Sequence, residues 1–301
     1  MERAGHPPGT ILQAASGFSG AMLQLGNASS PCCTAVSVEN LVLDGHGRSG
    51  VNGILNTTAQ DFSYVDHVSL YQILGTGLSI SATNSGPYTN INFDTGSYTA
   101  ASSTVCASIS GTTGTRGFRG LTCTGETANA NAAILLDSSN NTIEDVRIAG
   151  FADGIRIGGS ADAHSNVLVN IVGDTDPRVT SPPIYTVRIR NTHNVSDVTV
   201  IGVSNSSVSG TYSIYDEVTG THLQDGTVGM YALGGAKNNG HALFTTSPNA
   251  PTWASGNGVP TGTCLKGSLY SCSGTSTSCN PGGGGKALWG CPSSSGWVAI
   301  K

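Results

Sequence analysis

Charged residues are scarce in this sequence: they fill 10% of its 301 positions, against about 25% in a typical soluble protein. Aromatic residues are also few, at 6%. The net charge is −5, and acids and bases are interspersed without a basic run. Proteins that follow a phosphate backbone need a basic surface, so the composition argues against nucleic acid as a partner.

Long apolar runs are absent as well. No window approaches the roughly 18 consecutive apolar residues that a membrane-spanning helix needs, so we expect no membrane span. The opening residues, MERAGHPPGT, lack the charged and then apolar order of a signal sequence. We therefore expect that an export signal was removed or that the numbering starts inside a longer precursor.

Cysteine is present, but without the spacing of zinc ligands. The eight cysteines include no CxxC pair, and no histidine lies near the last four. Zinc sites favour tight paired spacing, so disulfides in an oxidising compartment are the better interpretation. We therefore expect a secreted protein, extracellular or at a cell surface. The candidate disulfide residues near the C-terminus are Cys264, Cys272, Cys279 and Cys291.

Short segments of alternating apolar residues recur through the first three quarters of the chain. One series starts its apolar positions at Leu41, Val68, Ile91, Leu121, Val146, Val167 and Val198. A second, interleaved series is centred on Ile54, Leu78, Val105, Ile134, Ile155, Val187 and Ile214. Alternation of inward aliphatic and outward residues is typical of strands. Two or three strands per coil, stacked many times, predict an all-β fold, a parallel β-solenoid of about eight coils.

The residue before each first-series position is mostly Asn or Asp. The set is Asn40, His67, Asn90, Gly120, Asp145, Asn166 and Asp197. Asn and Asp tolerate left-handed backbone and bond to neighbouring amides, so we interpret this column as a structural corner. The residue before each second-series position is small, which a tight corner explains.

These paired strands, the corner column and the phrase NNTIEDVRIAGFADGIRIGG resemble right-handed parallel β-helix proteins of the pectate-lyase-like superfamily. The resemblance covers roughly residues 8 to 232. It implies the fold, but only weakly an activity, because the superfamily contains lyases, hydrolases, epimerases, phage tailspikes and non-catalytic surface proteins.

We expect four parts along the chain. They are an N-terminal coil or cap (1–30), the parallel β-helix (31–232), a cap or linker (233–262) and a small Cys-rich β-hairpin module (263–301). A module this small needs crosslinks in place of a large core. Its tryptophans suit either sugar stacking or a mini-core, and the mini-core is the plainer interpretation.

Cys106 and Cys123 fall in neighbouring strands of one coil and are candidates for an internal disulfide. Alternation points Cys123 inward and Cys106 outward, so free thiols remain the alternative.

Outward second-series positions bring two arginines together. Stacked strands place Arg156 and Arg188 side by side in adjacent coils, with Tyr215 next in line. Two neighbouring guanidinium groups need an anion, which is either the carboxylate of an acidic polysaccharide or a local partner. The local candidates are Asp137, Asp153, Asp174 and Asp176.

By resemblance to the superfamily's lyases, Arg156 or Arg188 would act as the catalytic base, with Asp153 beside them. Asp153, Asp174 and Asp176 would then be calcium ligands, although no acidic run matches a calcium loop. Asp174 and Asp176 are also candidate substrate-binding residues, as is Tyr215. No other cofactor is expected.

Polygalacturonases of this fold carry an Asp-Asp pair and a Gly-His-Gly in the active groove. Here Gly45-His46-Gly47 stands in an early coil and no Asp-Asp dipeptide occurs. Arg190 in YTVRIRN stands where their lysine lies, which makes it a candidate substrate-binding residue. These departures leave a hydrolase mechanism of that kind in doubt.

Two function classes therefore stand side by side. The first is a secreted β-helix that binds, and as a lyase or glycoside hydrolase cleaves, a polysaccharide, with acidic polymers as the first candidates. The second is a non-catalytic extracellular part, such as a tail-fibre-like protein, an adhesin or a filament subunit that self-associates into trimers or filaments. The second predicts exposed apolar surface at the rod ends or a trimeric axis, and no paired carboxylates within reach of the arginines.

Overall fold

The computed structural model describes most of the chain. Complete residues are described over 10–26, 35–98, 103–111, 114–125, 131–175, 182–206, 211–218, 260–264, 266–272, 288–293 and 296–300. The backbone alone is described over 126–130, 221–224, 228–233 and 253–256.

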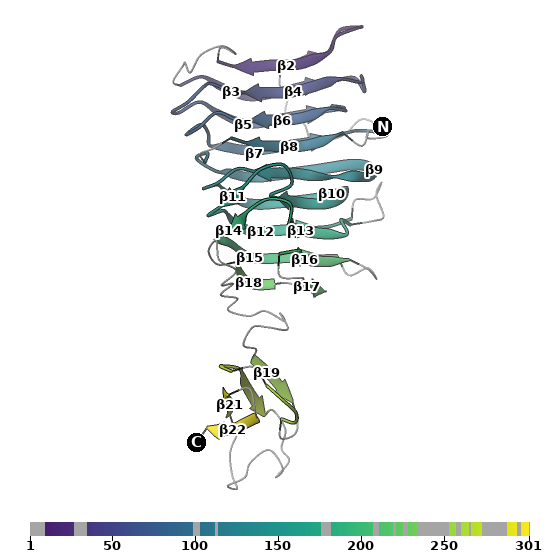
Figure 1. Ribbon diagram of the computed structural model, residues 1–301. Coiled ribbons are helices and arrows are strands. Elements are labelled where there is room, and N and C mark those ends of the chain that lie inside the picture. Colours follow the sequence, from purple (N-terminus) through teal and green to yellow (C-terminus); the bar gives the residue numbers. More distant parts are fainter. Residues whose placement is uncertain are drawn as a thin grey trace.

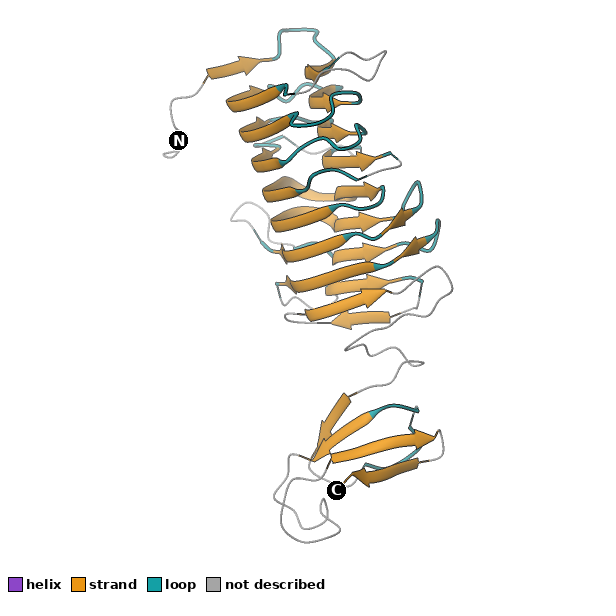
Figure 2. Ribbon diagram, turned by 90° about the vertical axis from the view of Figure 1, so that its left-hand side faces the viewer, coloured by secondary structure: helices purple, strands orange, loops and turns teal. Residues whose placement is uncertain are grey.

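Two faces of parallel strands stack into a β-solenoid (Figures 1 and 2). The first face contains β1 (Thr10–Gln13), β3 (Ser37–Asp44), β5 (Tyr64–Tyr71), β7 (Tyr88–Asp94), the first part of β9 (Phe118–Asp137) and of β10 (Thr142–Ile157), β12 (Val167–Gly173) and β15 (Val198–Asn205). The second contains β2 (Gly20–Leu25), β4 (Val51–Asn56), β6 (Thr76–Ile80), β8 (Val105–Ser110), the remainder of β9 and β10, β13 (Tyr185–Ile189) and β16 (Tyr212–Asp216). The chain completes about seven turns, and the described residues contain no helix, so the predicted fold class is confirmed.

The two ends of the rod differ. At the C-terminal end, β17 (Thr221–Gln224) and β18 (Val228–Leu233) run antiparallel to β16 and β15 and close both faces. At the N-terminal end, β1 is exposed along its length and presents Ile11 and Leu12 to solvent. A third, short side is formed by β11 (Ala163–His164) and β14 (Val195–Ser196), which pair in parallel.

One apolar core fills the rod, because each strand turns its aliphatic residues toward the interior. Buried aromatic rings meet across coils. Tyr88 stacks on Phe118 of the next coil, with ring centroids 4.9 Å apart, and the tilted rings of Phe93 and Phe151, two coils apart, have centroids 6.4 Å apart. Coil thus stabilises coil, as expected for a solenoid in which each repeat contacts its neighbours.

The corner column is confirmed in five coils and displaced in the last two. Backbone φ is positive at Asn40, His67, Asn90, Gly120 and Asp145. The register then aligns Val146 with Ile171 and Val203, so the column continues at Asn170 and Gly202. Asn166 instead lies buried and accepts hydrogen bonds from the N–H and the amide of Asn141. The prediction took the first aliphatic residue of each segment, whereas the left-handed residue that aligns with the earlier coils lies inside β12 and β15. Asp197 is left-handed as predicted, but it does not align with this column.

A disulfide joins Cys106 on β8 to Cys123 on β9, with Cα atoms 5.8 Å apart. The expected pairing is confirmed, but the outward orientation of Cys106 is wrong, because this residue is buried. Ala107, and not Val105, aligns with Leu78, so Cys106 occupies the small corner position. The crosslink therefore lies inside the solenoid.

Replacing both cysteines with serine (C106S together with C123S) is expected to lower the free energy of unfolding by about 3 kcal/mol. The bond closes a loop over a sequence separation of 17 residues, and opening it restores chain entropy to the unfolded state. Urea unfolding followed by circular dichroism would measure the change. The C264S, C291S double variant is the control, since its disulfide lies in a different sheet. An unchanged solenoid midpoint in the first variant would contradict the expectation.

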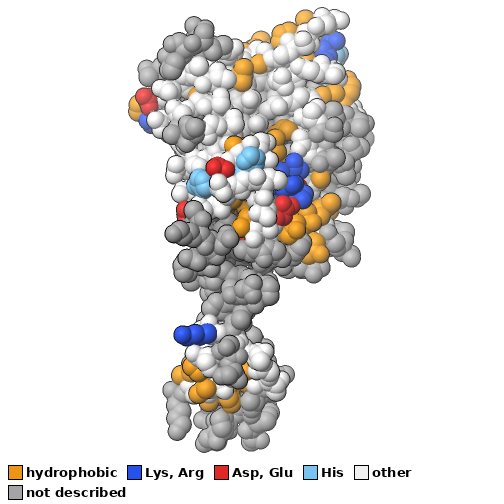
Figure 3. Space-filling view, in the orientation of Figure 1, with side chains coloured by type: hydrophobic (Ala, Val, Ile, Leu, Met, Phe, Trp, Pro, Cys, Tyr) orange, Lys and Arg blue, Asp and Glu red, His pale blue; other side chains and the backbone are white. Residues whose placement is uncertain are grey.

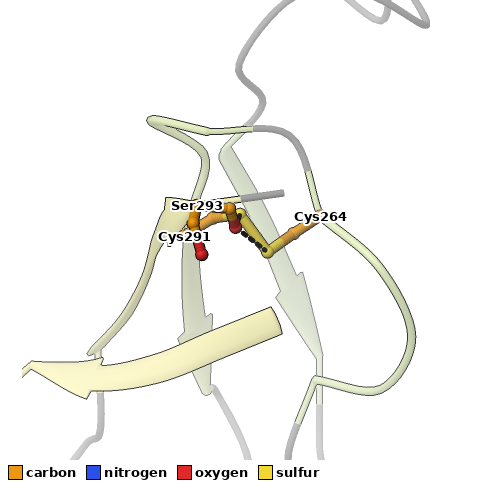
Figure 4. Close-up of a disulfide and its surroundings, with 3 residues drawn as sticks. All are labelled: Cys264, Cys291 and Ser293. Atoms are coloured by element: carbon orange, nitrogen blue, oxygen red, sulfur yellow. Dashed lines mark hydrogen bonds between the residues drawn. A yellow bond between two sulfur atoms is a disulfide. The ribbon is translucent and has the colours of Figure 1, made fainter. Parts of the chain in front are cut away.

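The C-terminal part forms a sheet of its own, in the order β19 (Trp253–Gly256), β20 (Leu269–Cys272), β21 (Leu288–Ser293) and β22 (Gly296–Ile300). Its first strand lies within the segment that we expected to be a cap or linker. Cys264 and Cys291 form a disulfide, and the carbonyl of Ser293 lies 3.0 Å from Cys291 Sγ (Figure 4). Because disulfide sulfurs carry no proton, this is a contact and not a hydrogen bond.

Two further predictions concern this sheet. Cys272 is disulfide-bonded as well, whereas Cys279 lies outside the described residues. Trp289 is buried, as a mini-core requires, and Trp297 packs against Tyr270 with ring centroids 5.8 Å apart. The mini-core interpretation is therefore confirmed for Trp289.

Candidate functional site

Two rows of outward side chains cross the last coils of the second face. The register aligns Arg156 with Arg188 and Arg188 with Tyr215, which confirms the predicted row. A second row, three residues earlier in each strand, aligns Asp153, Tyr185 and Tyr212. We call these two rows, together with the residues directly after β13 and β16, the arginine–tyrosine face. The rows contain Asp153, Arg156, Tyr185, Arg188, Tyr212 and Tyr215, and the residues after the strands are Arg190 and Glu217.

A corner between the rows explains why residues three apart share one side. After Asp153 the chain turns at Gly154, where a Cβ would lie 2.3 Å from the carbonyl oxygen of Thr186. The next residue, Ile155, points into the core and is fully buried. Arg156 then points outward again, so it folds back over Asp153.

Two carboxylates hold the three arginines. Asp153 Oδ2 accepts hydrogen bonds from Arg156 Nε at 2.8 Å and from Arg188 Nη1 at 3.4 Å. Glu217 Oε1 accepts from Arg188 Nε at 2.8 Å. Arg190 Nε lies 3.0 Å from Glu217 Oε2, but its N–H lacks hydrogen-bond geometry. The local-partner interpretation is therefore confirmed for Asp153, and Glu217 is a partner that the sequence did not reveal.

The ion pair between Arg188 and Glu217 shifts the pKa values of both residues. Desolvation alone would raise the pKa of Glu217, but bonds from Arg188 and the N–H of Asn191, together with the charges of Arg188 and Arg190, lower it. Desolvation alone would lower the pKa of Arg188, and its bonds and proximity to Glu217 and Asp153 raise it instead. The surroundings therefore stabilise the charged forms of Arg188 and Glu217.

Glu217 should make stability depend on pH. Its pKa is lower in the folded protein than the ordinary value of 4.5, so its contribution is complete above that value and is lost as pH falls through the folded pKa. We expect the free energy of unfolding to fall below about pH 4.5, and less steeply in E217Q. Urea titrations at pH 3 to 7 would test this, with E144Q as the control that removes a charge from the first face. Equal slopes in the wild type and E217Q would contradict it.

Aromatic rings border the arginines. The Tyr185 ring centroid lies 4.9 Å from that of Tyr215 and 5.8 Å from that of Tyr212. The Arg188 guanidinium carbon lies 5.2 Å from the Tyr185 centroid and 5.9 Å from the Tyr215 centroid. All three tyrosines are half-buried, and Ile184 beside them is exposed. Figure 3 shows charged side chains beside a hydrophobic patch on the lower part of the rod.

Other predicted site residues lie elsewhere. Asp174 pairs with Arg147 at 2.6 Å and accepts bonds from the Thr175 N–H and the Ser206 hydroxyl, so its partners are not the arginines of the face. Asp137, in contrast, lies at the border of the face: it accepts a bond from the N–H of Ser160, and its Oδ1 lies near the Arg156 side chain. Asp176 lies outside the described residues.

Sequence reasoning missed Tyr185, Tyr212 and Glu217, although a signal for each existed. The segments YTVRI and YSIYD both begin with tyrosine, at the same offset from their aligned aliphatic residues. Glu217 stands directly after β16, as Arg190 stands directly after β13. Comparison of equal offsets in adjacent coils would have indicated all three.

Neither a metal-binding cluster nor a membrane-spanning helix is found in the described residues. Within the part of the chain that the structure describes, no group of three or more His, Cys, Asp or Glu side chains is placed to hold a metal ion. No helix in that part is long and apolar enough to cross a membrane.

Comparison with known proteins adds no relative. No protein-family profile, curated protein or solved structure matches the chain. The architecture is therefore established as a parallel β-solenoid from the strand pairing alone.

Proposed function

We propose that this protein is an extracellular carbohydrate-binding solenoid whose arginine–tyrosine face receives a polysaccharide chain. The observation that carries the proposal is the contact among Tyr185, Tyr212 and Tyr215 beside Arg188. Aromatic rings next to hydrogen-bonding groups suit sugars, which present an apolar ring face and polar hydroxyls. Burial raises the pKa of Tyr185, so its hydroxyl stays protonated. The buried disulfide is compatible with an oxidising location.

The same contacts favour binding over proton transfer. A glycosidase of the usual kind needs one carboxyl group that stays protonated, whereas Arg188 contacts Asp153 and Glu217 and the pKa of Glu217 is lowered. A lyase base must release its proton, whereas the pKa of Arg188 is raised. We therefore propose Arg156, Arg188 and Asp153 as binding and positioning residues.

Affinity electrophoresis on a panel of acidic and neutral polysaccharides, with and without calcium, would test binding. We expect Y185A and Y215A to weaken binding by about tenfold or more, as for central aromatic anchors. Y64A is the matched control, because Tyr64 is also half-buried on a strand but lies on the first face. Equal loss in Y64A, or retention in all three variants, would refute the proposal.

Cleavage is measured on the same panel. Release of reducing ends or of unsaturated uronates that disappears in R156A or R188A would establish an enzyme instead of a binding protein. We expect neither product to accumulate.

A structural role is the second candidate, because the N-terminal coil exposes apolar side chains. Ile11, Leu12 and Phe18 are 63%, 41% and 37% exposed. The edge of a sheet with such residues favours self-association. A structural protein was also expected to have no paired carboxylates near the arginines, and Asp153 and Glu217 do not fit that expectation. Sedimentation of the wild type and of the I11S, L12S double variant would decide: only a filament subunit or other oligomer would dissociate.

A further inference from the structure

The charges on the arginine–tyrosine face are nearly balanced. Three arginines (Arg156, Arg188 and Arg190) meet the carboxylates of Asp153 and Glu217. A third carboxylate is near: Asp137 Oδ1 and Arg156 Cδ both lie within 4 Å of the point where a Cβ on Gly159 would stand. Three positive and three negative groups leave little net field to attract an anionic polymer.

The edges of Arg156 and Arg188 that would bind a carboxylate are also occupied. A carboxylate binds a guanidinium best side-on, through Nε and one NH2 group. In Arg156 those two atoms lie 2.8 and 2.7 Å from Asp153 Oδ2. In Arg188 they lie 2.8 and 2.6 Å from Glu217 Oε1. A uronate would have to displace an internal carboxylate that is already well paired.

The third nitrogen of each of these two guanidinium groups has a partner as well. Arg156 Nη1 donates to Asn131 Oδ1 at 3.2 Å, and Arg188 Nη1 donates to Asp153 Oδ2 at 3.4 Å. The rings of Tyr185 and Tyr215 lie beside the Arg188 guanidinium. The arginines therefore orient the tyrosines and satisfy the buried Asp153, and the aromatic rings with exposed Ile184 remain as the main contact surface.

From this geometry we infer that the face selects an uncharged polysaccharide over a polyuronate. The inference rests on the proposed function and reverses the preference for acidic polymers that the arginines suggest in the sequence. Its physical basis is that a neutral sugar needs only the ring faces and hydroxyl contacts, whereas a uronate must compete with Asp153 and Glu217 for the same guanidinium edges.

The first test compares a soluble β-glucan, a xylan and a galactan with polygalacturonate and alginate, at 50 and 500 mM NaCl. We expect at least one neutral polymer to bind about tenfold more tightly than either polyuronate. Its affinity should change less than about twofold between the two salt concentrations, because an uncharged polymer forms no charge pairs with the protein for salt to screen. Tighter, salt-sensitive binding of a polyuronate would overturn the inference and leave the proposed function intact. Binding of none would overturn both.

The second test changes the balance of charge. E217Q removes one carboxylate and frees the Nε edge of Arg188 from its anion. We expect E217Q to gain polyuronate binding at 50 mM NaCl and to lose it at 500 mM, while E144Q, the matched charge change on the first face, gains none. If folded E217Q still rejects polyuronate, the charge explanation is wrong. If E217Q fails to fold by circular dichroism, the wild-type comparison decides alone.

Discussion

Phe151→Ala is expected to lower the free energy of unfolding by about 3 to 5 kcal/mol, the usual cost of removing a buried phenylalanine. Phe151 lies on β10 with 2% of its surface exposed, and its ring packs 6.4 Å from that of Phe93 on β7, two coils away. The cavity would open inside a rod whose coils stabilise one another, two residues before Asp153. The variant should therefore disturb the side chains of the arginine–tyrosine face as well as the packing of the core.

Phe62→Ala is the matched control. Phe62 is 63% exposed, and its main contact is the Arg116 guanidinium, 4.5 Å from the ring centroid. Its loss should cost no more than about 1 kcal/mol. Urea unfolding of both variants measures the difference, and costs of similar size would show that the interior of the rod is not packed as described.

Asp153→Ala is expected to cost about 3 kcal/mol. The Asp153 side chain is 2% exposed and neutralises two guanidinium groups, of which Arg156 is 19% and Arg188 24% exposed. Removing one partner of a buried ion pair leaves the other charge without compensation, which costs about 3 to 5 kcal/mol in fully buried pairs. Partial exposure of the arginines places the expected cost at the lower end.

Arg119→Ala is the exposed counterpart for this second prediction. Arg119 pairs with Asp145 at 3.1 Å, but both side chains face solvent, so its loss should cost less than about 1 kcal/mol. Asp153→Asn keeps the shape and one acceptor and should fall between the two alanine variants. Thermal and urea unfolding would rank the three. An Asp153→Ala cost as small as that of Arg119→Ala would show that the arginines find other anions.

The paired strands could be predicted because burial imposes alternation on each one. Inward residues such as Ile155 and Val187 must be aliphatic to fill the core, and their outward neighbours Arg156 and Arg188 follow by alternation. The left-handed corner could be predicted at Asp145 for a similar local reason. Both patterns depend on interactions within a few residues along the chain.

The register of the less regular coils could not be predicted in the same way. In β8, β12 and β15 several residues compete for the inward position, and pairing with the coils on either side selects among them. That selection buried Cys106 beside Cys123 and moved the corner to Asn170. The aligned inward residue moves by two positions in β8, four in β12 and five in β15, and alternation along one strand does not specify which residue pairs with the adjacent coil.

The sequence by itself determined the parallel solenoid, the arginine row and Asp153 as a local partner, because periodic burial and stacking fix which residues point outward. Only the tertiary structure decided what the arginines do. It brought Glu217 onto Arg188 across adjacent coils and placed Tyr185 and Tyr212 in register with Asp153, beside the arginine row. The charge balance of the face depends on distances between coils, which no pattern along a single chain specifies.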